Sequence, residues 1–246
     1  MPDGERTHPL PPLHRYVLDE NGVTDAETLK LARDRAAVLR SVHQSMPVDG
    51  PWVERRVAAM IRSWLPPGVQ VSMNAQLADP DRPKLRSCSW DIIIHDPVGP
   101  EWGCPPPPDM MAGFPLVPTP LAYAAIDTKG FLDPGGAREY VAGRAFNHLN
   151  DCTLPQLDIL HPTVIPILLV MATSGAAATL EAAVKESLKL FCLGKVQATP
   201  VADGESRVIT WTLVGGHGAD LPLQRLRRTI MRAMEQRTEN QEIAHA

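Results

Sequence analysis

A block of nine prolines within residues 97–120 limits how the middle of this 246-residue chain can fold. Proline has no backbone N–H for a strand ladder, so the centre of a sheet cannot run through this block. We expect a long loop here, inserted between the strand-like segments CSWDIIIHD (88–96) and LAYAAIDTK (121–129). Loops of this length are usually functional or disordered, so the block is either a gate or partner-binding segment, or a disordered insertion.

Regular structure is expected on both sides of the block. Apolar residues recur at helical spacing, and we expect helices over 25–45, 52–65, 137–151, 177–194 and 223–237. Further strands are expected at 69–77, 163–172 and 207–214. A chain that passes from helices into three strands, and then alternates helix and strand, predicts an α/β fold with a mixed sheet flanked by helices.

The domain organisation follows from the same patterns. We expect an N-terminal extension and helix at 1–48, one main α/β domain at 49–236 that contains the proline block, and a polar tail at 237–246. The length suits a single elaborated domain, and we find no internal repeat.

Composition excludes several classes of protein. The net charge of −4 gives no global positive field that would draw nucleic acid or an anionic membrane. The four cysteines form no C-x-x-C pair, so neither a zinc knuckle nor a disulfide framework is indicated. The N-terminus has no apolar signal core, and the longest apolar run, at 164–172, is too short to span a bilayer. We therefore expect a cytoplasmic protein without membrane contacts.

Acidic side chains and one lysine are placed where strands begin and end. Asp127 and Lys129 are two residues apart at the end of a strand and face the same way, whereas Thr128 faces the other way. Asp91 begins the strand that precedes the proline block, and it can approach Asp127 if the two strands pair. Two neighbouring carboxylates repel unless a cation lies between them, and Mg²⁺ prefers oxygen ligands. Glu54, at the edge of a helix stripe, offers a third carboxylate, and the lysine can serve a water or stabilise a phosphorane-like transition state.

This set resembles the PD-(D/E)xK nuclease superfamily. Glu54 matches the acid of the early helix, Asp91 the strand aspartate, and Asp127-Thr128-Lys129 the (D/E)xK tripeptide. The resemblance implies that Asp91 and Asp127 bind Mg²⁺ or Mn²⁺ and that the Thr128 backbone carbonyl joins them. It also implies that Lys129 serves the attacking water and that Glu54 assists.

A narrower resemblance extends over about residues 50–155. The strand SWDIIIHD, the proline block and the segment VPTPLAYAAIDTKGFL are similar to a bacterial nuclease-like domain of unknown function in the same superfamily. The resemblance implies a restriction-endonuclease-like core and hydrolysis of DNA in preference to RNA. It further implies a role in bacterial defence against foreign DNA, as a homo-oligomer or with a partner protein in a defence complex.

Other readings of the same residues stay open. In the alternative interpretation, Asp127 and Lys129 form an ordinary surface ion pair. Asp91 would then be a strand-edge acid that pairs with Arg86, and Glu54 would belong to a solvent-exposed helix face. His95 is either a further site residue or a polar strand end. The arginines of the last helix either grip phosphates or form a solvated face, and they are Arg225, Arg227, Arg228, Arg232 and Arg237.

The rival functions belong to different classes. One is a non-catalytic nucleic-acid-binding or scaffolding module that retains the nuclease fold within a larger complex, and the acidic net charge favours it. Another is a small-molecule phosphohydrolase, which needs a compact pocket rather than a basic groove. The complete set of Glu54, Asp91, Asp127 and Lys129 favours the metal-dependent nuclease.

Overall fold

The structure is a computed structural model, and it describes residues 14–41, 49–81, 86–99, 115–146, 164–184, 188–202, 204, 206–215 and 218–244. Its largest feature is a six-stranded mixed sheet in the order β4-β2-β3-β5-β6-β7. The strands are β2 (Gln70–Ala78), β3 (Arg86–His95), β4 (Leu116–Pro118), β5 (Ala122–Phe131), β6 (Ile165–Ala172) and β7 (Lys189–Cys192). The fold is therefore built around β5, which is central in this order.

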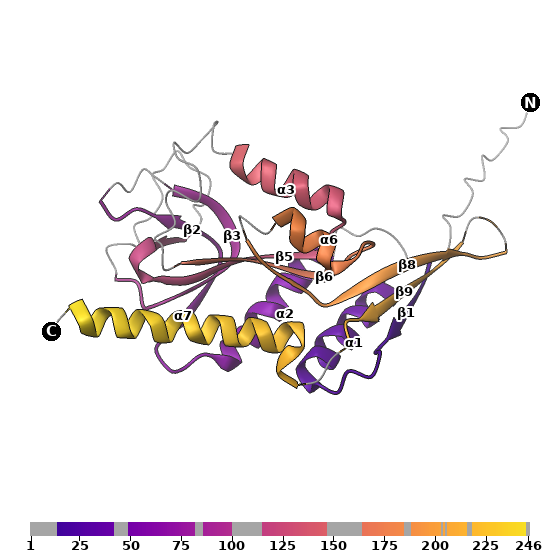
Figure 1. The fold of residues 1–246 in the computed structure, drawn as a ribbon, viewed down its shortest axis with the longest axis horizontal. Helices are drawn as coiled ribbons and strands as arrows, with labels where there is room; N and C mark the ends of the chain where they lie inside the picture. Colours follow the sequence, from indigo (N-terminus) through magenta and orange to yellow (C-terminus); the bar gives the residue numbers. More distant parts are fainter. Residues whose placement is uncertain are drawn as a thin grey trace, which may run out of the picture.

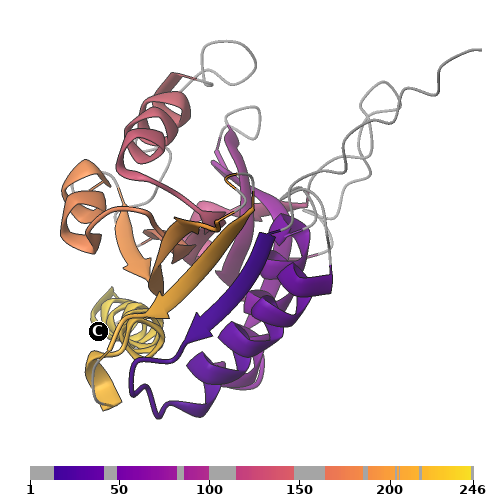
Figure 2. The ribbon, with the colours of Figure 1, turned by 90° about the vertical axis from the view of Figure 1, so that its right-hand side faces the viewer.

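A second sheet has three strands in the order β1-β9-β8. Its strands are β1 (His14–Asp19), β8 (Gly194–Pro200) and β9 (Arg207–Leu213). Figure 2 shows this sheet beside the helix α1 (Ala26–Ser41), which packs against β1. The three-stranded sheet joins the larger one where β7 continues into β8 and Thr173 bridges Lys195.

Helices cover both faces of the six-stranded sheet (Figure 1). On one side lie α2 (Asp49–Trp64) and α7 (Pro222–Ala244), and on the other lie α3 (Pro134–Phe146) and α6 (Ala177–Val184). Two short 3-10 turns, η3 (Thr119–Leu121) and η4 (Gly218–Asp220), complete the described elements. The α2 side buries a large apolar cluster that includes Val57, Ile126 and Ile230, and the α3 side buries a smaller one around Leu168 and Leu180.

The β5 strand is buried on both of its faces. Residues 122–128 are all buried, as expected of a central strand covered by helices on both sides. It pairs antiparallel with β3, with Ile92 opposite Ile126, and parallel with β6, with Asp127 opposite Leu168. The expected pairing of the strands at 88–96 and 121–129 is therefore confirmed.

The prediction of one helix over 177–194 is wrong beyond Val184. Helix α6 ends at Val184, and the chain then forms β7 parallel to β6 and continues into β8. A Cβ atom built on Gly194 would lie 2.5 Å from the Thr212 carbonyl oxygen, so only glycine fits this close approach. The helix-forming composition of residues 188–191 is overridden because β7 supplies a hydrogen-bonded partner for the edge of β6.

Three other stretches differ from expectation. The N-terminal extension contains β1, which pairs in parallel with β9. Within the proline block, residues 116–118 form the edge strand β4, with Pro118 at its end as an edge strand tolerates. Helix α7 continues to Ala244, through most of the expected polar tail. The parts of the helices expected at 42–45 and 147–151 lie outside the described residues.

No helix among the described residues is both long enough and apolar enough to cross a membrane.

Candidate functional site

Strand β5 carries Asp127 and Lys129 at the end that faces α3. Asp127 lies opposite Leu168 and Lys129 opposite Val170 in β6, and both partners belong to the apolar cluster of α3 and α6. Thr128 lies opposite Leu169, which belongs to the cluster of α2. Asp127 and Lys129 thus share one face of the strand and Thr128 takes the other, as period-two alternation predicts.

Asp91 joins this group where the pairing of β3 and β5 ends. Its Oδ2 accepts hydrogen bonds from the Thr128 backbone N–H at 2.6 Å and from the Thr128 hydroxyl at 3.1 Å. Its own backbone N–H donates to Asp127 Oδ1 at 3.4 Å. The expected approach of Asp91 to Asp127 is confirmed, and Thr128 holds the Asp91 carboxylate in place.

Glu54 reaches the same region from α2, the helix that covers the other face of β5. Its side chain is half-buried, and two residues of the same helix, Val53 and Val57, are fully buried in the core. Burial and the negative charge of Asp91 raise the pKa of Glu54, whereas Lys129 and Arg55 oppose this rise. The carboxylate therefore lies within electrostatic reach of both Asp91 and Lys129.

Asp127 has the strongest electrostatic perturbation of the group. Its side chain is completely buried. Burial is the main reason that its pKa lies well above the usual value, and the nearby charges of Asp91 and Glu54 raise it further. Lys129 acts in the opposite direction and favours the ionised form. A buried carboxyl group whose pKa is perturbed by neighbouring charges is typical of a functional site.

Lys129 is also positioned by a residue that the sequence does not single out. Its ammonium nitrogen lies 5.3 Å from the centroid of the Tyr140 ring on α3. An ammonium over an aromatic face is attracted by the ring quadrupole, and this contact orients the lysine at the strand end. Nothing in the local sequence around Tyr140 predicts the contact, because it depends on how α3 packs against β5.

The chemistry of these side chains fits a hard divalent cation. Asp91, Asp127 and Glu54 supply carboxylate oxygens, which Mg²⁺ prefers. Burial first, and then the neighbouring negative charges, raise the pKa values of Asp127 and Glu54, and a bound cation would offset both effects. In the part of the chain that the structure describes, no three His, Cys, Asp or Glu side chains are gathered closely enough to hold a metal ion as they stand. Asp91 is directed instead toward Thr128.

His95 lies away from this group. It is four residues along β3 from Asp91, beyond a register irregularity, and it is buried. Its two ring nitrogens contact the Ser72 hydroxyl at 2.8 Å and the Asp96 carbonyl at 2.6 Å. Burial lowers its pKa. His95 therefore ties β2 to β3, and its place among the site residues is not supported.

The arginines of α7 separate into two groups. Arg225, Arg227, Arg228 and Arg232 are exposed. Arg237 is buried instead, because its guanidinium lies 4.8 Å from the Tyr123 ring centroid, 3.6 Å from an Asp96 oxygen, and donates to the Ala122 carbonyl. Burial, together with the hydrogen bond to Asp96 and the charge of Asp96, raises the pKa of Tyr123 to about 12, whereas the charge of Arg237 opposes this rise. Arg237 thus anchors α7 to the start of β5.

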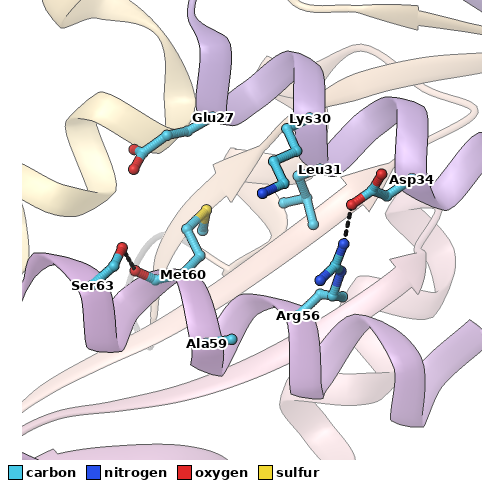
Figure 3. Close-up of a pocket in the computed structure, with 8 residues that line it drawn as sticks. All are labelled: Glu27, Lys30, Leu31, Asp34, Arg56, Ala59, Met60 and Ser63. Atoms are coloured by element: carbon cyan, nitrogen blue, oxygen red, sulfur yellow. Dashed lines mark hydrogen bonds and ion pairs between the residues drawn. The ribbon is translucent and has the colours of Figure 1, made fainter.

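A cavity of about 270 Å³ lies between α1 and α2 (Figure 3). Its charged side chains are largely engaged with their neighbours. Arg56 forms an ion pair with Asp34, and the Glu27 carboxylate accepts from the Trp64 indole at 2.9 Å. These contacts tie the two helices together, so we regard the cavity as structural.

Comparison with known proteins gives one informative result. The amino-acid sequence matches no family model and no curated protein. The structure of NucC from P. aeruginosa ATCC27853 in its cAAA-bound form is similar, with a TM-score of 0.51, 16% identity, and coverage of 85% of this chain and 89% of NucC. NucC from E. coli MS115-1, also cAAA-bound, gives a TM-score of 0.49, 15% identity and coverage of 86% and 93%.

The first of these likenesses covers most of both chains. The chain therefore has the fold of NucC, and the predicted fold class, an α/β restriction-endonuclease-like core with a mixed sheet flanked by helices, is confirmed. At this identity the likeness shows the fold alone. The narrower resemblance to one bacterial domain stays a prediction.

Thr128→Val tests whether Thr128 positions Asp91. Valine keeps the shape and the backbone N–H but removes the hydroxyl that donates to Asp91 Oδ2. Losing one such hydrogen bond costs about 1 kcal/mol, so we expect any nuclease activity to fall by about fivefold. Thr128→Ser should retain it. Equal rates for the valine and serine variants would contradict a positioning role for the hydroxyl.

Proposed function

We propose that the chain is a metal-dependent nuclease that hydrolyses phosphodiester bonds of DNA. The observation that carries this proposal is the junction of β3 and β5, where Thr128 holds Asp91 beside the buried Asp127. Glu54 and Lys129 lie within electrostatic reach of the same point. The agreement of this junction with the PD-(D/E)xK pattern in the sequence, on a chain with the fold of NucC, supports the proposal.

Each side chain has a role in this proposal. Asp91, Asp127 and Glu54 would hold Mg²⁺ or Mn²⁺, and the Thr128 carbonyl would be a further oxygen donor. A bound cation of this kind supplies Lewis acidity toward a phosphoryl oxygen. Lys129 would orient the attacking water and stabilise negative charge on the phosphate, and the Tyr140 ring would keep its ammonium at the strand end.

The partners and biological setting are part of the proposal. We propose DNA as the substrate and a role in bacterial defence against foreign DNA. The negative net charge argues that a monomer holds a duplex weakly, so we also propose that the chain acts as an oligomer or with a partner protein. Because the similar NucC structure from P. aeruginosa ATCC27853 is bound to cAAA, we also propose that a ligand of this class affects the activity of the chain.

The proposal is tested by incubating the purified full chain with plasmid DNA and with single-stranded DNA. The assay includes Mg²⁺, Mn²⁺ or EDTA, each with and without cAAA. We expect cleavage with either cation and none in EDTA. Binding of DNA without cleavage under every condition would favour the alternative function, a non-catalytic nucleic-acid-binding module. Cleavage that persists in EDTA would contradict a metal-dependent nuclease.

A further inference from the structure

A second cavity, of about 250 Å³, lies where the three-stranded sheet meets the ends of β5 and β6 and the helix α1. Its lining is almost wholly apolar and includes three aromatic residues, Tyr16 of β1, Phe131 of β5 and Trp211 of β9. It is smaller than the roughly 300–1,000 Å³ that drug-sized ligands occupy. The size and lining therefore suit one flat ring system rather than a larger ligand.

One face of the three-stranded sheet forms a wall of this cavity. Ile209 lies opposite Tyr16 on one side and opposite Ala198 on the other, so all three side chains share a face. Tyr16 and Ile209 are half-buried and Ala198 is exposed. The apolar face is therefore only partly covered by α1, and the cavity is open to solvent at Ala198.

A single charged residue contributes to this apolar lining. Among the described residues that surround the cavity, Arg35 of α1 is the one that carries a charge, and it is 3% exposed. Its guanidinium carbon lies 4.8 Å from the centroid of the Trp211 ring. This cation–π contact packs Arg35 against Trp211 at the wall of the cavity, so the surface that the cavity offers stays almost wholly apolar.

One residue of the cavity lining lies close along the chain to the proposed catalytic lysine. Phe131 follows Lys129 by two residues on β5, and both belong to that strand. Two residues of a strand span roughly 6–7 Å, about the distance between the two backbone positions. A ring that contacts Phe131 would therefore lie at the same end of β5 as Lys129.

We propose that this cavity is a base-binding subsite that takes one unstacked nucleobase of the strand whose backbone lies at Lys129. The inference rests on the proposed nuclease function and adds a substrate preference to it. Aromatic side chains stack on any base, because every base has a π face. A base can enter the cavity only when it is unstacked, so the subsite favours single-stranded or locally opened DNA over an intact duplex.

The test measures binding in EDTA, where the proposed enzyme does not cleave. Fluorescence anisotropy compares a labelled single-stranded oligodeoxynucleotide with an abasic strand of the same length and label. The two strands have the same phosphate charge, so a difference reports on the bases. Stacking of one base gives a preference of about tenfold. We expect the wild-type protein to bind the base-bearing strand about tenfold more tightly than the abasic strand.

Two variants show whether the preference for bases arises in the cavity or elsewhere on the protein surface. Ala198→Phe places a ring in the cavity, whereas Thr199→Phe places the same ring on the opposite face of β8 at an exposed position. We expect Ala198→Phe to lose the preference for bases and Thr199→Phe to keep it. If Ala198→Phe melts below the wild type, Phe131→Leu, which removes a ring but keeps apolar bulk, should weaken the preference instead.

The outcomes for the subsite and for the nuclease are distinguishable. Metal-dependent cleavage together with equal binding of the two strands, or with an unchanged preference in Ala198→Phe and Phe131→Leu, overturns the subsite and leaves the nuclease standing. A base preference that Ala198→Phe removes, without cleavage under any condition, supports the base-binding cavity and rejects the nuclease.

Discussion

Lys129→Ala is expected to lower metal-dependent cleavage of DNA by a factor of about 10²–10⁴, the range for loss of one catalytic proton-transfer or charge-stabilising group. Alanine removes the ammonium that lies beside Asp127 and over Tyr140. The half-buried side chain contributes little to packing, so the melting temperature should stay near that of the wild type. Initial rates on plasmid DNA with Mn²⁺, together with thermal unfolding, measure both effects.

Lys189→Ala is the matched control for this experiment. Lys189 is an exposed lysine at the start of the edge strand β7, opposite Ile167 rather than near the end of β5. Its loss changes the net charge by the same amount and should leave the rate unchanged. A Lys129→Ala protein that cleaves as fast as Lys189→Ala would rule out a catalytic role for Lys129.

Asp127→Asn is expected to abolish cleavage and, without divalent cations, to raise the free energy of unfolding by roughly 1–3 kcal/mol. Burial and the charges of Asp91 and Glu54 hold the pKa of Asp127 well above its usual value. The folded protein therefore binds the proton more tightly than the unfolded chain does. The free energy of unfolding of the wild type should therefore fall as the pH rises from the pKa of Asp127 in the unfolded chain to its pKa in the folded protein. Asparagine does not ionise, so the variant should not show this decrease.

Urea unfolding in EDTA at acidic and at mildly alkaline pH measures this difference. The asparagine variant should exceed the wild type most at the higher pH, and the two should approach each other below the unfolded pKa of aspartate. Mg²⁺ should stabilise only the wild type, because a ligand adds stability in proportion to its binding to the folded state. Asp81→Asn, at an exposed aspartate, is the control and should change neither quantity. If Asp127→Asn were less stable than the wild type in EDTA at alkaline pH, the ionised Asp127 side chain would not be destabilising the folded protein, and this account would be contradicted.

The sequence predicts the centre of the fold well and its margins poorly. The strands on either side of the proline block have continuous apolar runs, which are typical of strands buried on both faces. Residues 188–191 have helix-forming composition, but pairing with the edge of β6 determines their structure. The strand β1 is likewise set by a partner, β9, that lies at the other end of the chain. Local patterns do not carry this long-range pairing.

The same distinction holds for the candidate site. Asp91 and Asp127 lie where the pairing of β3 with β5 ends, and alternation places Lys129 on the same face as Asp127, so one correct pairing brings the three residues together. The hydrogen bonds from Thr128 to Asp91 and the contact of Lys129 with Tyr140 depend on how strands separate and helices pack. His95 keeps the alternation of β3, since it contacts Ser72, which lies opposite Ile93, but it is four residues along the strand from Asp91 and so lies away from the site. The position of Glu54 can be predicted because the apolar residues of α2 determine which face of this helix packs against the core.

The most direct test of the proposed centre is calorimetric titration of Mn²⁺ into the wild-type protein and into Asp127→Asn at neutral pH. We expect saturable binding by the wild type and loss of that binding in Asp127→Asn. Binding by the wild type should weaken when the titration is repeated at lower pH, because the raised pKa of Asp127 favours its protonated form. Identical titrations of the two proteins, or no binding to either, would contradict a metal centre formed by Asp91, Asp127 and Glu54.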